Sequence, residues 1–414
     1  MDGSGPRHTG ALEGLTVLDL TQMLSGPFAS MLLADQGARV IKIEPPGGET
    51  TRRVGPFLEG QTRMEEGGYG SYFASINRNK ESIVVDLKSP DGIALFKRLT
   101  ARADVVIENF RAGVTHRLGL DYETLARDNP RLVVAALRGF GDPASGESPY
   151  AAWPAYDPVA QAMGGIMGIT GPVPGGAPTK IGPGVGDLVP ALFMAFGIVS
   201  AVLSARASGR GQFVDVAMVD GVLAVCERLV YQHSATGDVP GPEGDGHPLL
   251  CPFGLFKAKD GYVSLGIPKD EFWGPFCAVI GAPHLGDDPR YRLNADRVAR
   301  RDEVNGIVTA FTTRHTKAEL LEIFGGRIPF GPVLRADEIF ADPHFAARGM
   351  LPEVEVPGAS RPLTVAGTPV HMSRTPGGVR RRAPLTGEDT DRILADFGFD
   401  EAERQALQAA GAVA

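Results

Sequence analysis

One carboxylate, Asp187, stands where a glycine-rich turn meets a long apolar stretch, in the segment from Gly182 to Gly209. Apolar residues recur at helical spacing after it, which predicts a buried helix that begins near Asp187 and ends at the last glycine. Asp is a preferred N-cap residue, so capping is the ordinary interpretation. Gly184 and Gly186, however, leave room for a ligand, and an ionised carboxylate held at a helix N-terminus can attack an acyl group. Both interpretations stay open on this segment alone.

Further polar and aromatic side chains follow predicted strands in the first part of the chain. Asn109 and Phe110 follow one apolar run, and Arg138 and Gly139 follow the next. In an open parallel sheet, ligands bind outside the carboxyl ends of the strands. The runs are apolar on both faces, which predicts an α/β fold with a Rossmann-like parallel sheet covered by helices on each side. The predicted strands are Leu15–Leu20, Arg39–Glu44, Ser82–Leu87, Asp104–Glu108, Arg131–Leu137 and Gln212–Val216. No G-x-G-x-x-G follows the first strand, so nothing favours a dinucleotide cofactor.

The remaining segments predict a second, smaller domain of mixed α and β structure. Residues 47–75 are predicted as a long surface or active-site loop, and Met218 to about His233 as one helix. Residues 236–248 are dense in Gly and Pro and mark an internal boundary. Beyond it, Gly254–Ala258 and Tyr262–Leu265 flank a turn and predict a hairpin. Helices are expected near 270–280, 297–313 and 317–325, strands near 352–356 and 363–366, and a final helix from Thr390.

Composition excludes several classes of function. The 414 residues carry a formal net charge of −8 with no long basic block, which argues against nucleic acid as a partner. The three cysteines, Cys226, Cys251 and Cys277, are scattered, which argues against a disulfide framework or a metal site and favours the cytoplasm. The start of the chain has no apolar signal core, and the apolar run after Asp187 contains Pro190, so we expect a buried helix and no membrane partner.

Taken together and in this order, the motifs resemble those of the family III CoA-transferases, which include formyl-CoA transferase, carnitine CoA-transferase and the related 2-methylacyl-CoA racemases. Each motif is weak alone, but the series spans nearly the whole chain. The matching segments are LEGLTVLDLTQMLSGPFASMLLADQGARVIKIEPPGG (12–48), NRNKESIVVDLKSPDG (77–92), ADVVIENFRAGVTHRLGLDYETL (103–125), NPRLVVAALRGFG (129–141), YDPVAQAMGG (156–165), GPGVGD (182–187), GRGQFVDVAMVDG (209–221) and GPV (331–333).

The resemblance implies a reaction and an architecture. Asp187 falls on the family's nucleophile position and would attack an acyl-CoA thioester, giving a mixed anhydride and then an aspartyl-CoA thioester, with glycine-segment amides available for the oxyanions. CoA is a substrate, no cofactor is bound permanently, and no metal is needed. The implied fold is an interlocked homodimer with a discontinuous large domain. We expect residues 1–205 as its first part, 206–244 as a linker, 245–330 as the small domain, and 331–414 as a linker and a return to the large domain.

By position, the resemblance also implies which residues bind the substrates. Two cations would meet CoA phosphates, and aromatic and apolar side chains would contact the nucleotide or pantetheine. The implied CoA contacts are Val85, Leu87, Lys88, Asn109, Phe110, Arg117, Leu118 and Tyr156. The candidates for the acyl group and its distal carboxylate are Leu24, Ser25, Arg52, Arg53, Arg138 and His247.

Departures from formyl-CoA transferase bear on the substrate. That enzyme has a glutamine where this chain has Leu24, a lysine where it has Pro154, and four glycines roughly where it has Gly244–Pro248. These changes favour a larger, dicarboxylic acyl group of the succinyl, mesaconyl or itaconyl kind over formyl or oxalyl chemistry. The racemase alternative needs a histidine as a second acid/base, and this chain has Tyr156 directly before the aspartate of that helix. A CoA-binding protein without chemistry is the other alternative, and the retained Asp187 argues against it.

Overall fold

The computed structural model describes residues 10–242 and 244–413. Within it the chain forms two compact units, which we describe one at a time. The first unit contains residues up to Ile166, Ile181–Glu227 and Pro343–Ala414. The second contains Met167–Lys180 and Arg228–Asp342. The first unit is therefore assembled from three separated stretches of the chain.

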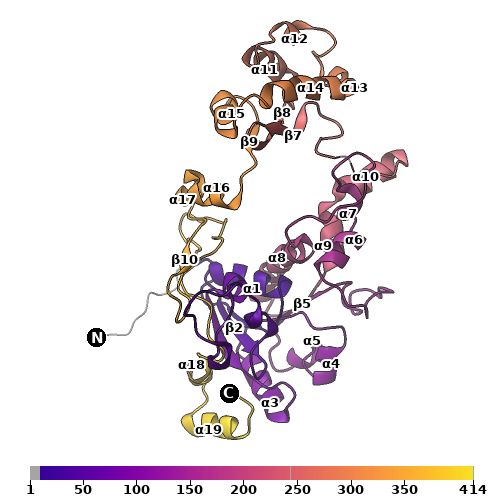
Figure 1. Ribbon diagram of the computed structural model, residues 1–414. Coiled ribbons are helices and arrows are strands. Elements are labelled where there is room, and N and C mark those ends of the chain that lie inside the picture. The colour runs from indigo at the N-terminus through magenta and orange to yellow at the C-terminus, as the bar shows by residue number, and fades with distance from the viewer. Residues whose placement is uncertain (1–9, 243, 414) are drawn as a thin grey trace. The chain divides into compact units, whose positions relative to one another are not determined.

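A six-stranded parallel sheet forms the centre of the first unit, as the sequence predicts (Figure 1). The strand order is β3-β2-β1-β4-β5-β6, so the order reverses between β1 and β4. All five neighbouring pairs are parallel. The strands are β1 (Thr16–Asp19), β2 (Arg39–Glu44), β3 (Lys80–Val84), β4 (Val105–Glu108), β5 (Val133–Arg138) and β6 (Phe213–Ala217).

Helices cover both faces of this sheet. Alternate strand residues such as Leu18, Ile41 and Val106 share one apolar cluster with α3 and α18. The helices α1 and α8 pack on each other and on strands of the same sheet. Helix α3 begins after Ser89, because the Ser89 hydroxyl accepts from the Gly92 amide and proline follows it. The helices of this unit are α1 (Ser25–Asp35), α2 (Ser71–Asn77), α3 (Pro90–Thr100), α4 (Val114–Leu118), α5 (Tyr122–Leu125), α6 (Asp157–Met163), α8 (Val185–Ser208), α9 (Met218–Val225), α17 (Pro343–Ala347), α18 (Thr390–Asp396) and α19 (Glu401–Ala409).

Helix α8 is the long apolar helix that the sequence predicts after the glycine-rich turn, but only one face of it is buried, so the prediction of a buried helix is only partly right. It ends at Gly209, whose φ of 74° places it in the left-handed conformation that glycine adopts easily. Pro190, Ala191, Met194 and Ile198 lie on its buried face. In the described part of the chain it is also the one helix long and apolar enough to cross a membrane. A core helix passes the same test, so this property by itself does not assign a membrane segment.

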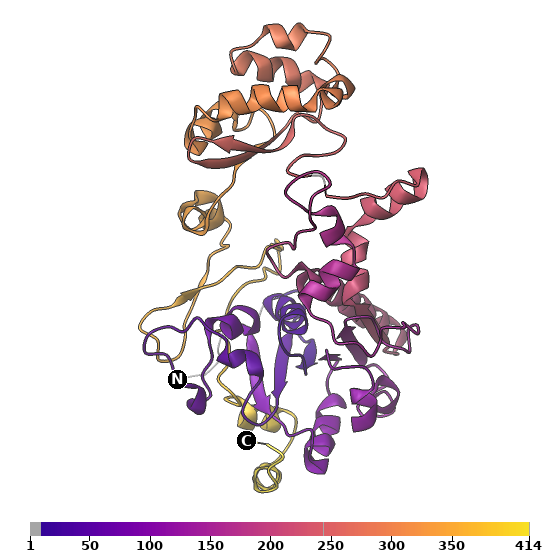
Figure 2. The same cartoon turned by 45° about the vertical axis from the view of Figure 1, so that its right-hand side comes forward.

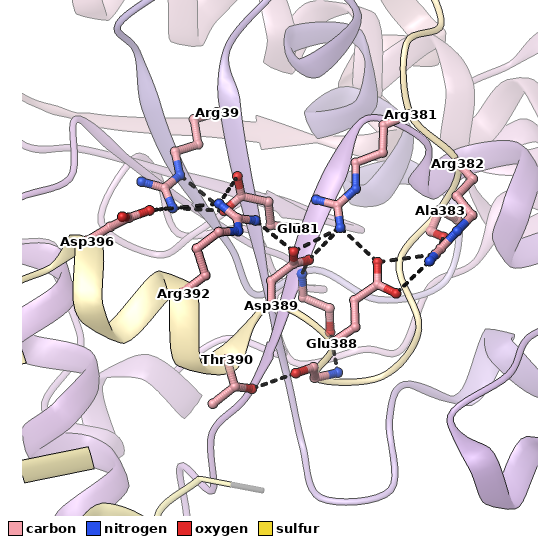
Figure 3. Close-up of polar contacts among 12 residues, drawn as sticks. Arg39, Glu81, Arg381, Arg382, Ala383, Glu388, Asp389, Thr390, Arg392 and Asp396 are labelled. Atoms are coloured by element: carbon pink, nitrogen blue, oxygen red, sulfur yellow. Dashed lines mark hydrogen bonds and ion pairs between the residues drawn. The ribbon is translucent and has the colours of Figure 1, made fainter. Parts of the chain in front are cut away.

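The C-terminal segment returns to the sheet of the first unit, where α18 contacts the outer strand β3 (Figure 2). Ion pairs join it to β2 and β3, as Figure 3 shows. Arg39 on β2 pairs with Asp396 at 2.6 Å and with Glu81 at 3.0 Å. Arg392 pairs with Glu81 at 3.2 Å and with Asp389 at 2.7 Å. Two short strands, β10 (Glu353–Val354) and β11 (Leu363–Thr364), lie where the sequence predicts strands in this segment.

The second unit contains a three-stranded antiparallel sheet in the order β7-β8-β9. The predicted hairpin is present, with Ala258 opposite Gly261. The unit has its own apolar core around Trp273, Phe276 and Phe324. Its elements are α10 (Glu227–Thr236, which starts at the boundary), β7 (Phe253–Ala258), β8 (Gly261–Gly266), α11 (Trp273–Val279), α12 (His284–Asp287), α13 (Asn294–Ala299), α14 (Arg301–Thr312), α15 (Lys317–Phe324), β9 (Phe330–Pro332) and α16 (Ala336–Ala341), with α7 (Ile166–Ile169) at the other boundary.

Two predictions of local structure are wrong. The helix expected from Met218 to about His233 is broken at Cys226, into α9 with three buried residues and α10 with none. The break lies where the chain leaves the first unit, directly before Glu227. Neither glycine nor proline stands at Cys226, so the local sequence gives no signal for the break. The expected loop at 47–75 contains two short 3-10 helices, Thr50–Arg53 and Met64–Glu66, and the first residues of α2.

Candidate active site

A pocket of about 230 Å³ opens at the carboxyl edge of the sheet, beside the point where the strand order reverses. The segments that follow β1, β4, β5 and β6 all contribute to its wall. Asp187, from the start of α8, lies in the same wall. The residues that line the pocket include Met23, Ser25, Asn109, Phe110, Arg111, Arg138, Trp153, Tyr156 and Asp187.

The carboxylate of Asp187 is not the cap of α8. The N-cap residue of α8 is Gly184, which has no side chain that could cap the helix. Asp187 is the third residue of the helix. The cap comes from another helix, because Asp157 of α6 accepts a hydrogen bond of 2.9 Å from the Gly186 amide. Gln161 donates to the same carboxylate oxygen at 2.8 Å and fixes it. The capping interpretation of Asp187 is therefore wrong, and its carboxylate lines the pocket instead.

The glycines before Asp187 serve helix packing and not ligand access. A Cβ on Gly186 would lie 2.5 Å from the Asp157 carbonyl oxygen, so only glycine lets α6 pack here. A Cβ on Gly184 would lie 3.2 Å from Cδ2 of Leu24. The expectation that these two glycines leave space for a ligand is thus wrong, since protein atoms fill that space.

Burial makes Asp187 a weak acid. Desolvation, with the nearby charge of Asp157, raises the pKa of Asp187 to about 6, although a hydrogen bond from Ser25 lowers it. The expectation that the helix end alone keeps this carboxyl strongly ionised is therefore too simple. Above pH 6 the carboxylate form predominates and is available as a nucleophile. Tyr72 on α2 faces it, and burial together with the charges of Asp187 and Glu49 raises the pKa of Tyr72 to about 12.

Backbone amides near Asp187 are free on α1 and not on α8. Val185, Gly186, Asp187 and Leu188 all donate to acceptors within α6 or the preceding turn. The amides of residues 185–188 are therefore not available to an oxyanion. By contrast, within the described part of the chain no acceptor receives the amides of Met23, Leu24 or Ser25, which precede and open the eleven-residue helix α1. Such a helix start can stabilise an anion.

The implied CoA-contact residues divide into three groups. Asn109, Phe110 and Tyr156 line the pocket with Asp187. Phe110, Leu87 and Leu118 pack on the apolar cluster that contains Val85. Val85 itself is 1% exposed, so its side chain offers little binding surface, and its contact with CoA stays a prediction. Lys88 and Arg117 are exposed, and no acidic residue within 10–242 or 244–413 pairs with either.

The implied acyl-site residues are only partly brought together. Ser25 and Arg138 line the pocket, and Leu24 lies against Gly184 beside it. Arg53 is exposed and is not part of this wall. His247 belongs to the second unit, where it lines a separate pocket of about 500 Å³ with Arg301 and Phe253.

Arg52 is a structural residue and not a substrate ligand. It is 2% exposed, and its guanidinium pairs with both oxygens of Glu44 at 2.7 and 2.5 Å. A third nitrogen donates to the Pro384 carbonyl at 3.0 Å, and the Phe73 ring lies 4.0 Å beneath. With its donors used and its cation neutralised, Arg52 cannot reach a substrate carboxylate, so that prediction is wrong.

Arg138 lines the pocket but is already neutralised. It donates to Glu108 and pairs with Asp142 at 3.0 Å. Burial raises the pKa of Glu108 to about 7, against the opposing effect of Arg138. A further carboxylate would compete with two that are already present. Arg111 lines the same pocket, is exposed, and pairs with no acidic residue that the structure describes.

Sequence reasoning missed several residues around this pocket. Asp157 has a local signal, because Asp-Pro at a helix start is typical of a first turn, but its role as the cap of another helix has none. Tyr72 lies in a segment that the sequence predicts as loop. Trp153 is 56% exposed in the pocket wall, with its ring 4.6 Å from that of Tyr150. Within the described ranges, no group of His, Cys, Asp or Glu is arranged to hold a metal ion.

These features define an α/β protein with a carboxylate-bearing pocket at the switch point of a parallel sheet. The chain matches the family described as CoA-transferase family III over residues 12–390. It therefore belongs to CoA-transferase family III, as its motifs predict, and it is an enzyme of that family.

Its relatives match along nearly their whole length. The succinyl-CoA:mesaconate CoA-transferase of Haloarcula marismortui is 43% identical over 394 residues, which is 94% of this chain and 97% of that one. The acetyl-CoA:oxalate CoA-transferase of Acetobacter aceti is 40% identical, over 95% of this chain and 97% of that one. The crystal structure of a CaiB/BaiF family protein from Brucella suis has a TM-score of 0.82 at 34% identity, and the match covers 94% of this chain and all (100%) of that one.

Proposed function

We propose that this CoA-transferase acts through a covalent intermediate on Asp187. One observation carries the proposal: the Asp187 carboxylate lines the pocket at the carboxyl edge of the sheet, while Asp157 performs the capping role that would otherwise explain it. A carboxylate that stabilises its own helix would be held against the backbone. A carboxylate that faces a pocket is available for bond formation.

The proposed reaction has two half-reactions, and each consists of two acyl-transfer steps. An oxygen of Asp187 attacks the thioester carbonyl, the C–S bond breaks, and CoA leaves as a thiolate with a mixed anhydride on the enzyme. The thiolate attacks the Asp187 carbonyl carbon, which releases the donor acid as a carboxylate and leaves an aspartyl-CoA thioester. The acceptor carboxylate repeats the two steps in reverse. The free amides of Leu24 and Ser25 are placed to stabilise the oxyanions, because they open α1 beside the pocket.

Two alternative functions are less well supported. A racemase needs a second acid/base opposite Asp187, and the described residues that line the pocket include no histidine. A CoA-binding protein without chemistry has no need for a half-buried carboxylate whose pKa is raised to about 6, because that ionisation destabilises the fold. Both features favour transfer.

We further propose a small dicarboxylic acid as the acyl group or the acceptor. The name of the Haloarcula relative supports this class, and so does Leu24, which offers no hydrogen bond to a formyl group. Arg111 replaces Arg52 and Arg138 as the cation for the distal carboxylate, because it is exposed in the pocket wall without an acidic partner in the described part. Arginine binds a carboxylate with two parallel hydrogen bonds.

A panel of substrates tests this assignment. Succinyl-CoA, acetyl-CoA, butyryl-CoA and formyl-CoA are assayed as donors, each with mesaconate, itaconate and oxalate as acceptors. We expect kcat/KM for succinyl-CoA to exceed that for butyryl-CoA by about 100-fold or more, because a substrate without the distal carboxylate leaves Arg111 unpaired. In Arg111→Gln that ratio is expected to fall by at least about 10-fold. If formyl-CoA or butyryl-CoA is the best donor, the dicarboxylate assignment is wrong although transfer itself stands.

We also propose that the enzyme is an interlocked homodimer. Leu192, Phe196, Val199 and Leu203 form one exposed apolar stripe along α8, with Phe196 74% exposed. An apolar face of this kind is typical of a surface that another chain covers, and the family resemblance indicates a second copy. Because interlocked chains separate only on unfolding, sedimentation at nanomolar concentration is expected to show no folded monomer. A compact, folded monomer would contradict the interlocked arrangement.

A further inference from the structure

The side chain of Asn109 holds the turn that follows β1. Its Oδ1 accepts from the Gln22 amide at 2.9 Å, and its Nδ2 donates to the Gln22 carbonyl at 2.7 Å. One amide group thus binds both backbone groups of a residue 87 positions away. These two bonds use one of the two donors and one of the two lone pairs that the amide offers.

The turn that Asn109 holds is strained. Met23, directly after Gln22, has a φ of 68°, which is unfavourable for a side chain of its size. Such a conformation persists only where surrounding contacts fix it. On the other side of the turn, Asp19 accepts from the Thr21 amide at 2.9 Å, and Lys42 donates to the Thr21 carbonyl at 2.9 Å. The backbone of residues 21 and 22 is therefore fixed at all four polar groups.

This turn leads directly into the parts of the pocket that contact Asp187. Met23 and Ser25 line the pocket together with Asp187, and the nearby Ser25 hydroxyl favours the ionised form of the Asp187 carboxylate. The free amides of Leu24 and Ser25 lie in the same segment. A shift of Gln22 would therefore move both the free amides at the start of α1 and the Ser25 hydroxyl that favours the ionised Asp187 carboxylate.

We propose that Asn109 is a positioning residue: by clamping both backbone groups of Gln22, it holds Ser25 and the first amides of α1 against Asp187, and it is not primarily a ligand of CoA. This inference rests on the proposed function, in which Asp187 is the nucleophile. It differs from the role that the family resemblance implies for Asn109. A ligand binds substrate and transition state alike, whereas a positioning residue acts on the chemical step.

Kinetics of Asn109→Ala separate the two roles. With succinyl-CoA and mesaconate as substrates, we expect kcat to fall by about 10-fold or more and KM for succinyl-CoA to change by less than about 3-fold. The affinity for free CoA, measured by calorimetry, should stay unchanged. Asn109→Asp keeps the acceptor for the Gln22 amide and loses the donor to its carbonyl, so we expect an intermediate kcat.

The pH profile gives a readout that a merely structural role would not move. Asp187 is faced by Asp157 from α6 and by Tyr72 from α2, and Arg111 and Arg138 line the same pocket. Because the Ser25 hydrogen bond favours the ionised carboxylate, its displacement raises the pKa of Asp187. The acid limb of kcat/KM is therefore expected to move to higher pH in Asn109→Ala.

Asn129→Ala is the matched control. Asn129 also donates to two backbone carbonyls, of Thr100 at 3.0 Å and of Ala103 at 2.7 Å, but it is not part of the pocket wall. We expect a similar loss of stability with unchanged kcat and pH profile. The proposal is overturned if Asn109→Ala raises KM and weakens CoA binding with kcat unchanged. It is equally overturned if Asn129→Ala loses as much kcat.

Hydrogen exchange tests the clamp without any substrate. The Gln22 amide is expected to exchange faster in Asn109→Ala than in the wild-type protein, and equally slowly in Asn129→Ala. Unchanged protection of Gln22 would contradict the clamp itself. If the exchange result holds while an Asp187 variant keeps full transfer activity, the proposed nucleophile fails and the clamp does not.

Discussion

Asp187→Asn is expected to lose CoA transfer by about 10⁴-fold or more, because the amide cannot supply the nucleophilic oxygen that starts both half-reactions. The substitution is nearly isosteric, so the pocket should keep its shape. Affinity for free CoA should remain within about 3-fold of the wild-type value, since the implied CoA contacts are other residues. Steady-state transfer from succinyl-CoA to mesaconate and calorimetry with CoA measure the two effects.

Asp91→Asn is the matched control for this prediction. Asp91 also lies in the first turn of a helix, α3, and is exposed away from the pocket. Its loss removes a favourable interaction with the helix dipole and leaves activity unchanged. An Asp187→Asn enzyme that keeps more than about one tenth of the wild-type kcat would exclude a covalent role for the carboxylate.

The same substitution is expected to stabilise the protein in a pH-dependent way. The pKa of Asp187 is raised from 3.8 to about 6 in the folded chain, so the folded state holds its proton more tightly than the unfolded state. Stability of the wild-type protein therefore falls as pH rises through this range. The asparagine side chain of the variant cannot ionise, so its free energy of unfolding relative to wild type should rise by about 2 kcal/mol between about pH 4 and about pH 8.

Denaturant unfolding of both proteins at the two pH values measures this difference. Loss of function with gain of stability is the pattern expected of a carboxylate retained for chemistry and not for folding. If Asp187→Asn is destabilised equally at both pH values, the carboxylate serves the fold, and the electrostatic description of the pocket is wrong.

Local sequence patterns predict the sheet well because each strand is a short apolar run with helices on both sides. Arg39–Glu44 is predicted and observed with the same bounds. The pocket is predictable for the same reason, since the carboxyl ends of parallel strands meet at one edge. Asn109 and Arg138, which lie at the ends of β4 and β5, do line one pocket. Their position follows from topology alone.

The roles of individual side chains depend on contacts between distant segments, which no local pattern encodes. The cap of α8 comes from Asp157, 29 positions before the Gly186 amide that it accepts from. Arg52 is removed from the candidate site by its pairing with Glu44, at the end of β2, and by the Pro384 carbonyl, 332 positions away. Asn109 clamps a backbone 87 positions away. Residue type and order thus predict where the site lies, and tertiary hydrogen bonds decide which residues are free to act.

Mass spectrometry of the intact protein and its peptides after incubation with succinyl-CoA tests directly whether Asp187 forms the covalent intermediate. We expect a CoA-sized adduct, sensitive to hydroxylamine, on the peptide that carries Asp187, and no such adduct on Asp187→Asn. An active enzyme that shows no adduct under any quench, or an adduct on a different residue that persists in Asp187→Asn, would contradict the account.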